Sequence, residues 1–278
     1  MPELIVENLQ VSFPTWQGDV TVVNRVSFEM GAERLGIVGE SGSGKSLTAR
    51  AILGLIRPPG KVSADRMTFD GVDLTKLDAK GWRAIRGCRI GMILQDPKYS
   101  LNPVKRVLDQ IAEVAILHDC VSKQKVHERV LEMLGEVGVE DPLRVANCYP
   151  HQLSGGLGQR VMIVAMLINS PDLLIADEPT SALDVMVRGQ VLQLMDREIQ
   201  RRGMGLILIS HDLNTVARYC DRVLIMYQGK IVETCQADRL FEAHHPYTRG
   251  LLACLPSIST RGQKLSVLDR ATLDVEAC

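Results

Sequence analysis

The sequence predicts an α/β fold in which apolar strands alternate with helices and one long helical block interrupts the alternation. Three observations support this prediction: a strand, glycine loop and helix near residue 40, a helical pattern from about 104 to 168, and a return to strand–helix alternation after Pro171. Hydrophobic residues make up 46% and charged residues 23% of the 278, which is typical of a globular protein rather than a disordered one.

The first hundred residues alternate between β-rich runs and turn residues. The expected strands are 4–6, 22–28, 35–38, 67–74 and 90–94. A helix is predicted over 47–56, because the apolar pattern there ends at the helix-breaking segment Pro58-Pro59-Gly60.

The helical block has apolar residues at the spacing of one helix face after Ser122, which is the expected cap. They are Val126, Val130, Met133, Leu134 and Val137. After Pro171 we expect strands at 173–176 and 206–209, a helix at 185–201, and a hairpin of 223–227 with 230–233. The inner face of that helix is predicted to hold Val191, Leu194, Met195 and Ile199.

Composition excludes several classes of protein. The net charge of −1 gives no overall attraction to nucleic acid, and 4% aromatic residues are too few for a base-stacking platform. Seven dispersed cysteines indicate reduced thiols rather than disulfides or a zinc site. No signal peptide is apparent, and the longest apolar run, 161–168, is far short of the roughly twenty residues that span a bilayer.

One segment carries a complete phosphate-binding pattern, G-x-x-x-x-G-K-[ST], between a predicted strand and a predicted helix. Its residues are Gly39, Glu40, Ser41, Gly42, Ser43, Gly44, Lys45 and Ser46. The glycines let backbone N–H groups turn inward toward an anion, and the helix N-terminus adds partial positive charge. Lys45 can reach the terminal phosphates and Ser46 can bind Mg²⁺, so the chain is predicted to bind a nucleoside triphosphate such as ATP.

A pair of adjacent acids ends the strand predicted at 173–176. Asp177 fits the carboxylate that holds Mg²⁺, and Glu178 fits a base that positions water. If the strand geometry persists, the two side chains point to opposite faces and have different roles. The alternative is that the two acids are simply solvated at the end of a strand. The presence of a phosphate loop in the same chain disfavours this alternative.

A second anion-receptive helix end follows Leu153. Ser154 suits the N-cap, and Gly155 and Gly156 leave backbone amides uncovered. With this segment added, the chain resembles an ABC-transporter ATPase subunit over nearly its whole length. In that family the segment is the signature, which caps ATP bound to the phosphate loop of a second subunit, and this implies a head-to-tail dimer.

The resemblance extends to further positions. Gln95 matches the Q-loop glutamine that senses Mg²⁺, Ser181–Asp184 matches the D-loop, and His211 matches the switch histidine that contacts the γ-phosphate. Phe13 is the expected adenine-stacking aromatic, with Trp16 as competitor. Two signature positions depart from the family pattern: Leu157 should be benign, whereas Gly158 replaces the arginine often found in peptide-importer relatives. Slower or partner-dependent hydrolysis at that site is the hypothesis that follows.

The fold implied by the resemblance is a P-loop (RecA-like) ABC ATPase core with an N-terminal antiparallel β subdomain and an inserted α-helical subdomain. The ATPase domain would cover 1–258, with the β subdomain and core at about 1–95 and 169–235 and the helical subdomain at about 96–168. The extension 236–278 would follow, its last ~20 residues loosely ordered.

The segments 93–103 and 245–252 resemble the oligopeptide, dipeptide and nickel importer branch. This implies a second, different ATPase subunit, two membrane permease subunits and an external solute-binding protein, at the cytoplasmic face of the bacterial inner membrane. Peptides are the first choice of cargo and nickel or a metal chelate the second. The alternatives of another class are a soluble ABC ATPase and a non-catalytic regulatory subunit. The cysteines do not support an iron–sulfur cluster, and adjacent His244 and His245 do not favour a metal site.

Overall fold

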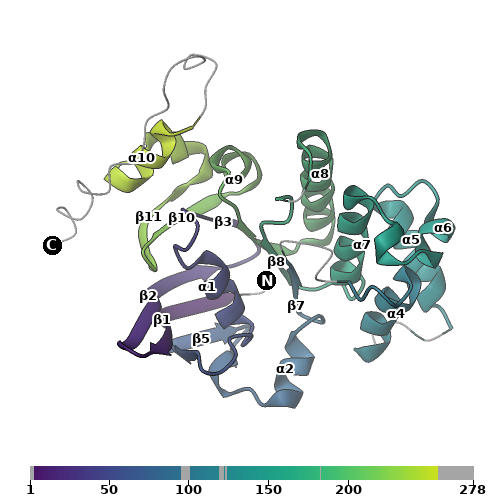
Figure 1. The fold of residues 1–278 in the computed structure, drawn as a ribbon, viewed down its shortest axis with the longest axis horizontal. Helices are drawn as coiled ribbons and strands as arrows, with labels where there is room; N and C mark the ends of the chain where they lie inside the picture. The colour runs from purple at the N-terminus through teal and green to yellow at the C-terminus, as the bar shows by residue number, and fades with distance from the viewer. Residues whose placement is uncertain (1–2, 95–100, 119–121, 123, 182, 256–278) are drawn as a thin grey trace. The chain divides into compact units, whose positions relative to one another are not determined.

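The computed structural model describes residues 3–94, 101–118, 122, 124–181 and 183–255. The chain divides into two compact units, and Figure 1 labels the helices and strands of both. The helical unit comprises Met1–Leu4, Glu29–Glu33 and Thr68–Ile209, and the loop unit comprises Ile5–Phe28, Arg34–Met67 and Ser210–Cys278. The predicted loose tail lies outside the described residues.

The loop unit is built on strand β3 (Arg34–Val38). It pairs in parallel with β10 (Arg222–Tyr227), which pairs antiparallel with β11 (Lys230–Gln236). The hairpin turn is the predicted one: Gln228 and Gly229 have φ of 46° and 78°, the two left-handed residues of a tight turn. Helix α9 (Leu213–Tyr219) packs so closely on β3 that a Cβ at Gly36 would lie 2.2 Å from Val216 Cγ1.

The N-terminal strands are longer than predicted. Strand β1 (Leu4–Thr15) neighbours β2 (Gly18–Met30) and pairs antiparallel with β4 (Lys61–Ser63). Between two exposed residues, the backbone N–H of Asn8 in β1 donates to Ser27 Oγ in β2 at 2.8 Å.

Helix α1 (Lys45–Ile52) is shorter than predicted. It ends four residues early because Gly54 takes a left-handed φ of 60° and lets the Leu55 N–H bond the Arg50 carbonyl at 2.8 Å. The short helix η3 (Ala237–Glu242) and helix α10 (Pro246–Ala253) complete the loop unit.

The helical unit contains three parallel strands, β7 (Ile90–Ile93), β8 (Leu173–Asp177) and β9 (Gly205–Ile209). Strand β8 is buried along its whole length. The region predicted as one β-segment at 67–74 is two strands, β5 (Arg66–Phe69) and β6 (Val72–Asp73), because Asp70 and Gly71 form a turn with positive φ.

The predicted helical block is confirmed. Its elements are α4 (Val107–Leu117), α5 (Val126–Glu136), α6 (Pro142–Asn147), the short η2 (Pro150–Gln152) and α7 (Gly155–Leu167). The predicted inner face of α5 is at most 2% exposed. The expected cap at Ser122 is wrong: α5 starts after Lys125, and it is the Ser122 carbonyl that accepts the N–H groups of Lys125 and Val126.

Helix α8 (Val185–Arg202) confirms the helix predicted at 185–201, with its four predicted inner residues buried. The Asp184 side chain caps its start by accepting the Val187 N–H at 3.0 Å, and Gly203, at φ 64°, ends it. Within the described part of this unit there are also η1 (Leu74–Lys76) and α2 (Ala79–Ile85). Among the residues that the structure describes, no helix has the length and apolar character needed to cross a membrane.

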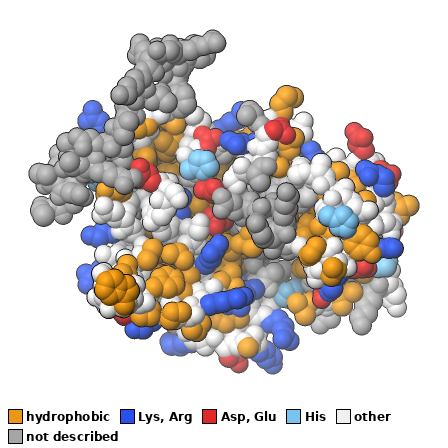
Figure 2. Space-filling view, viewed as in Figure 1, with side chains coloured by type: hydrophobic (Ala, Val, Ile, Leu, Met, Phe, Trp, Pro, Cys, Tyr) orange, Lys and Arg blue, Asp and Glu red, His pale blue; other side chains and the backbone are white. Residues whose placement is uncertain are grey.

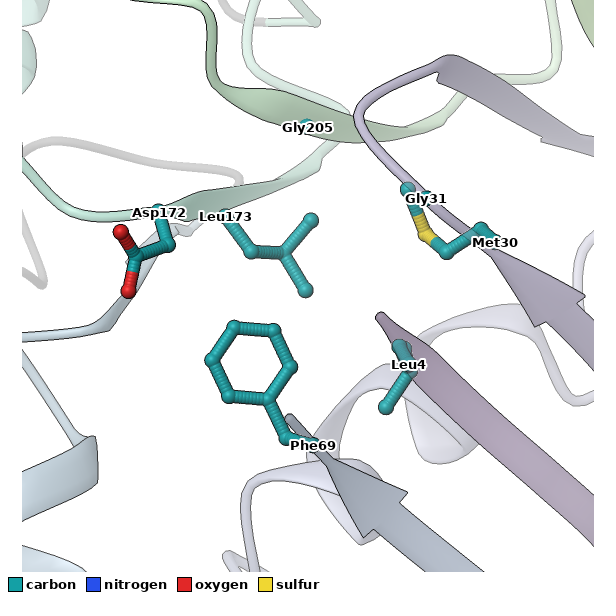
Figure 3. Close-up of a pocket in the computed structure, with 7 residues that line it drawn as sticks. All are labelled: Leu4, Met30, Gly31, Phe69, Asp172, Leu173 and Gly205. Atoms are coloured by element: carbon teal, nitrogen blue, oxygen red, sulfur yellow. The ribbon is translucent and has the colours of Figure 1, made fainter. Parts of the chain in front are cut away.

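A small apolar hollow lies at the amino ends of the parallel strands, where Leu173 begins β8 and Gly205 begins β9 (Figure 3). Leu4, Met30 and Phe69 complete its wall, and it has no room for a water molecule. Beside it, Arg89 pairs with Asp172 at 2.8 Å and lies over the Phe69 ring. The hollow is therefore a packing feature, at the opposite end of β8 from Asp177.

Candidate nucleotide-binding site

The phosphate loop leaves the carboxyl end of β3 and leads into α1, as predicted. Gly39 has φ of 152°, and a Cβ there would lie 2.2 Å from the carbonyl oxygen of Met226 in β10. Gly44 has φ of 101° and forms the left-handed N-cap of α1. These positions need glycine because the loop folds tightly against a neighbouring strand, which leaves its amides uncovered by side chains.

Lys45 is the first residue of α1, and its side chain is buried inside the loop. Its ammonium nitrogen lies 2.8 Å from the Gly39 carbonyl, 2.7 Å from the Glu40 carbonyl and 3.3 Å from Ser43 Oγ. Lys45 is only 5% exposed. The loop therefore surrounds the Lys45 ammonium with oxygen acceptors. An incoming phosphate can bind the same positive charge.

The β10–β11 hairpin supports the loop, which the sequence did not predict. The Gly229 N–H donates to the Ser43 carbonyl at 3.1 Å, and the Gly229 carbonyl accepts the Asn24 N–H at 2.8 Å. A Cβ at Gly229 would lie 2.3 Å from the Val22 carbonyl. The predicted Gln228-Gly229 turn thus also joins β2 to the phosphate loop.

His211 follows β9 and belongs to the loop unit. The Ser210 N–H donates to the Ile37 carbonyl at 3.2 Å, so the residue before the histidine lies against β3 shortly before Gly39. On the other side, the Asp212 N–H donates to Ser210 Oγ and the Asp212 carboxylate caps α9. His211 itself is exposed. Its backbone is fixed while its imidazole faces solvent.

The two aromatic candidates differ in their surroundings. Phe13 is half-buried, with its Cε1 within 2.7 Å of where a Cβ on Gly60 would lie. Trp16 is 91% exposed in the turn between β1 and β2. Figure 2 shows hydrophobic side chains on this face, over the region of β1 and β2. Both rings remain candidates for stacking on a base.

The acidic pair occupies the end of β8 in the helical unit. Asp177 is the last strand residue and 3% exposed. Glu178 leaves the strand with a left-handed φ of 47°, rare for a residue with a side chain, and its N–H donates to the Ile209 carbonyl at 3.0 Å. The strand geometry therefore does not persist through the pair. The two carboxylates are separated by a backbone turn rather than by simple strand alternation.

The signature segment forms the start of α7. Ser154 is the N-cap, as predicted, with its hydroxyl accepting the Leu157 N–H at 3.4 Å. Ser154 and Gly155 are exposed, so this helix end faces solvent. A Cβ at Gly156 would lie 2.8 Å from Val187 Cγ1, so glycine lets the first turns of α7 and α8 touch.

Two residues missed by the sequence reasoning tie this segment in place. Gln159, 1% exposed, donates through Nε2 to the carbonyl of Pro179, the residue after Glu178. Arg160 donates to the Val137 carbonyl at the end of α5 and to Gln190 Oε1 in α8. The sequence feature that could have pointed to Gln159 is a polar amide within one helix turn of the signature glycines.

The predicted residues thus fall into two groups. The helical unit contains Asp177, Glu178, the signature segment and the described D-loop positions Ser181, Leu183 and Asp184, and the loop unit contains Gly39–Ser46, His211 and Phe13. Gln95 lies outside the described residues.

Comparison with known proteins gives the family. Residues 23–181 match the family model described as ABC transporter. The chain belongs to the ABC transporter family. Dipeptide transport ATP-binding protein DppD of Bacillus subtilis is 46% identical over 98% of this chain and 82% of its own length. Oligopeptide transport ATP-binding protein OppD of the same organism is 46% identical over 94% and 74%.

Solved structures agree with this assignment. A dimeric, post-hydrolysis ATP-binding cassette bound to ADP and phosphate has a TM-score of 0.73 and 26% identity, covering 85% of this chain and 99% of that one. The structure of cbiO1 from Clostridium perfringens, described as part of the ABC transporter complex cbiONQ, has a TM-score of 0.70, 26% identity and coverage of 85% and 91%. The predicted fold class, a P-loop ABC ATPase, is confirmed, and the chain is an ATP hydrolase coupled to transport.

Proposed function

We propose that this chain is the energy-coupling ATPase subunit of a bacterial peptide importer. The observation that carries the proposal is the 46% identity to dipeptide and oligopeptide transport ATP-binding proteins across most of both chains. The names of these relatives favour peptides over nickel or a metal chelate as cargo. A soluble ABC ATPase has no comparable support among them.

The phosphate loop is proposed to bind the triphosphate of ATP. Gly39–Ser46 offers uncovered amides at the start of α1, and Lys45 supplies the positive charge. Ser46 and the buried carboxylate of Asp177 fit Mg²⁺, because hard divalent cations prefer oxygen ligands and a buried carboxylate favours a cation. When bound, Mg²⁺ would neutralise charge on the phosphate oxygens. Gln95 is proposed to share in sensing this ion.

Glu178 is proposed to position the attacking water and accept its proton, with His211 contacting the γ-phosphate. Ser154, Gly155 and Gly156 are proposed to cap the nucleotide of a second ATPase subunit, since their exposed helix end is receptive to an anion. Phe13 is proposed to stack on adenine. Hydrolysis would then remove the charge that bridges the two subunits and open the dimer.

The proposed partners are a second, different ATPase subunit, two membrane permease subunits and an external solute-binding protein. Within this assembly the chain would lie at the cytoplasmic face of the inner membrane. Cargo selection would belong to the binding protein and the membrane pathway.

Reconstitution tests this function. The chain is co-expressed with permease, binding-protein and second ATPase genes from its own operon. The purified complex is then reconstituted in liposomes, and uptake is measured with ATP supplied either inside or outside them. Labelled di- and oligopeptides should accumulate and stimulate ATP hydrolysis, whereas ⁶³Ni²⁺ should not. Glu178→Gln is the matched control, which should assemble without importing. Uptake of nickel alone, or failure to co-purify with any membrane subunit, would reject the proposal.

A further inference from the structure

The C-terminal part of the loop unit contacts the phosphate loop through one buried tyrosine. Tyr247, the second residue of α10, is 0% exposed. Its hydroxyl oxygen accepts the N–H of Glu40 at 2.9 Å. More than two hundred residues of sequence separate the two groups, so only the fold brings them together.

Tyr247 is held firmly on its own side. Its ring lies 4.3 Å from the Tyr227 ring of β10, tilted by 36°. Its N–H donates to His245 Nδ1 at 3.2 Å, which caps α10. The Glu233 carboxylate of β11 in turn accepts the N–H groups of His244 and His245 at 2.8 and 3.3 Å.

The surroundings of Glu233 hold the pKa of its carboxyl below the ordinary value. Burial raises its pKa, but the hydrogen bonds it accepts, including those from the two histidine N–H groups, lower the pKa further than burial raises it. The start of α10 therefore rests on a fixed negative charge of β11, and Tyr247 follows directly after it.

The contact acts on a single peptide unit of the loop. The N–H of Glu40 and the carbonyl of Gly39 belong to the same planar peptide. Tyr247 bonds the N–H end, and the Lys45 ammonium bonds the carbonyl end at 2.8 Å. Because the peptide is rigid, its rotation would disturb both bonds together. The tyrosine hydroxyl thus fixes an oxygen that holds the phosphate-binding lysine.

We propose that Tyr247 is a positioning residue for nucleotide binding, through which α10 controls the orientation of the Gly39–Glu40 peptide and of Lys45. This rests on the proposed role of the loop in binding ATP. It gives the segment after β11 a function at the nucleotide site of its own chain. Removing the hydroxyl lets the peptide rotate and leaves the lysine less well placed for the phosphates.

The test compares Tyr247→Phe with Tyr227→Phe. Each change removes one hydroxyl from the same ring pair, but the Tyr227 hydroxyl accepts from Gln228 rather than from the loop. Fluorescent-nucleotide titration should show an ATP and ADP Kd about three- to tenfold higher in Tyr247→Phe, the range expected for one buried hydrogen bond. Tyr227→Phe should stay near wild type, and adenosine, which has no phosphate, should bind all three proteins equally.

Two further measurements separate positioning from simple structural support. At saturating ATP, kcat of the assembled transporter should be unchanged while KM rises in Tyr247→Phe. Hydrogen exchange at the Glu40 amide should be faster in Tyr247→Phe only. In Lys45→Ala, adding Tyr247→Phe should cost less affinity than it does in wild type, because the two act through one peptide.

The outcomes are distinguishable. Equal ATP affinity of Tyr247→Phe and wild type, with a folded variant and faster exchange at Glu40, would overturn the positioning role alone. A wild-type protein that fails to bind ATP would instead reject the function on which it rests. Equal losses for ATP and adenosine would identify a general structural defect and also overturn the inference.

Discussion

The phosphate loop and the signature segment are both glycine-rich helix starts, yet they are constructed differently. The loop buries Ser43, Gly44 and Lys45 while its tip at Ser41 and Gly42 is exposed, and other parts of its own unit hydrogen-bond to it. The signature end is exposed, and its first turn, Gly155–Gly158, has no charged side chain. A helix end alone contributes roughly 0.3–1 kcal/mol to holding an anion. The loop is thus suited to bind a nucleotide by itself and the signature only to complete a site.

The glycines of the two regions show the same contrast. A Cβ at Gly39 would meet the backbone carbonyl of Met226 at 2.2 Å, which cannot move without shifting β10. A Cβ at Gly156 would meet a side-chain methyl of Val187 at 2.8 Å. At these two glycines, therefore, the loop packs against main chain and the signature against a side chain. The proposed binding of ATP and the proposed closure by the signature would therefore use regions held by different contacts.

The largest expected effect separates binding from turnover. Glu178→Gln removes the proposed base while keeping the size of the side chain, so hydrolysis should fall by about 10²- to 10⁴-fold. ATP affinity should be retained, because the loop is unchanged. Phosphate release and fluorescent-nucleotide titration measure the two quantities, and with the second ATPase subunit present, closed dimers of the two chains should accumulate in size-exclusion chromatography with ATP. Full turnover in this variant would remove Glu178 from its assigned role.

The second-largest expected effect tests whether the phosphate loop can bind ATP without the signature of a second subunit. Lys45→Ala deletes the cation within the loop, and loss of a charge-assisted bond of about 1.5–3 kcal/mol corresponds to roughly 10- to 150-fold weaker ATP binding. The measurement is made on the isolated chain, with adenosine as control ligand. If the isolated variant binds ATP as tightly as wild type, the loop does not act as the self-sufficient half of the site.

Sequence alone predicted the loop better than its surroundings. Gly39–Ser46 is a continuous pattern, and the strand, loop and helix that contain it follow from local residues. The left-handed backbone of Glu178 could not be predicted, because a glutamate rarely adopts it and the Ile209 carbonyl that bonds its N–H comes from another strand. The contact of Tyr247 with Glu40 likewise depends on tertiary packing that no local pattern encodes.

Some of the wrong predictions could have been avoided from the sequence itself. The early end of α1 follows from Gly54, a common left-handed helix terminator that lies before the prolines chosen as the stop. The division of 67–74 into two strands follows from the Asp70-Gly71 pair, which is typical of a tight turn. The Ser122 cap was wrong for a different reason: α5 begins only at Val126, and the backbone carbonyl rather than the side chain of Ser122 accepts the N–H groups there.

The two regions also differ in charge, and adding a charged side chain to the signature tests the effect of that difference. Gly158→Arg introduces the side chain often found in peptide-importer relatives, and one added bond to phosphate should raise turnover of the assembled transporter about three- to tenfold. Gly158→Ala is the control, since it improves helix propensity by roughly 1 kcal/mol without charge. Because Gly158 is buried, melting temperatures are compared first.

Two results would count against this reading of Gly158. Unchanged transport-coupled hydrolysis in a folded Gly158→Arg protein means that the missing arginine does not limit the site. An equal gain in Gly158→Ala assigns the effect to the helix rather than to charge.

The smallest expected effect concerns how the helical unit is held together. Glu136, at the end of α5, accepts from Arg201 of α8 at 2.7 Å and lies 3.4 Å from Arg129. Burial raises the pKa of Glu136, but the Arg201 hydrogen bond and the nearby guanidinium charges outweigh it and leave the pKa below the ordinary value of 4.5. The folded protein thus binds fewer protons here than the unfolded chain. The stabilisation is present above the unfolded pKa and is lost as pH falls through the folded one.

Glu136→Gln should therefore lower the free energy of unfolding at pH 7 by about 0.2–1 kcal/mol, the range of a partly exposed ion pair. The difference from wild type should shrink in high salt and vanish in acid, where the wild-type carboxyl is protonated as well. Urea unfolding at several pH values measures this. Glu132→Gln, which removes an exposed carboxylate 3.2 Å from Arg129 on the same helix, is the matched control and should change stability less. ATP affinity should be unaffected in both, because the loop is held by hydrogen bonds within its own unit rather than by surface charges. A loss of ATP affinity in Glu136→Gln would show that nucleotide binding by the phosphate loop depends on how the helical unit is held together.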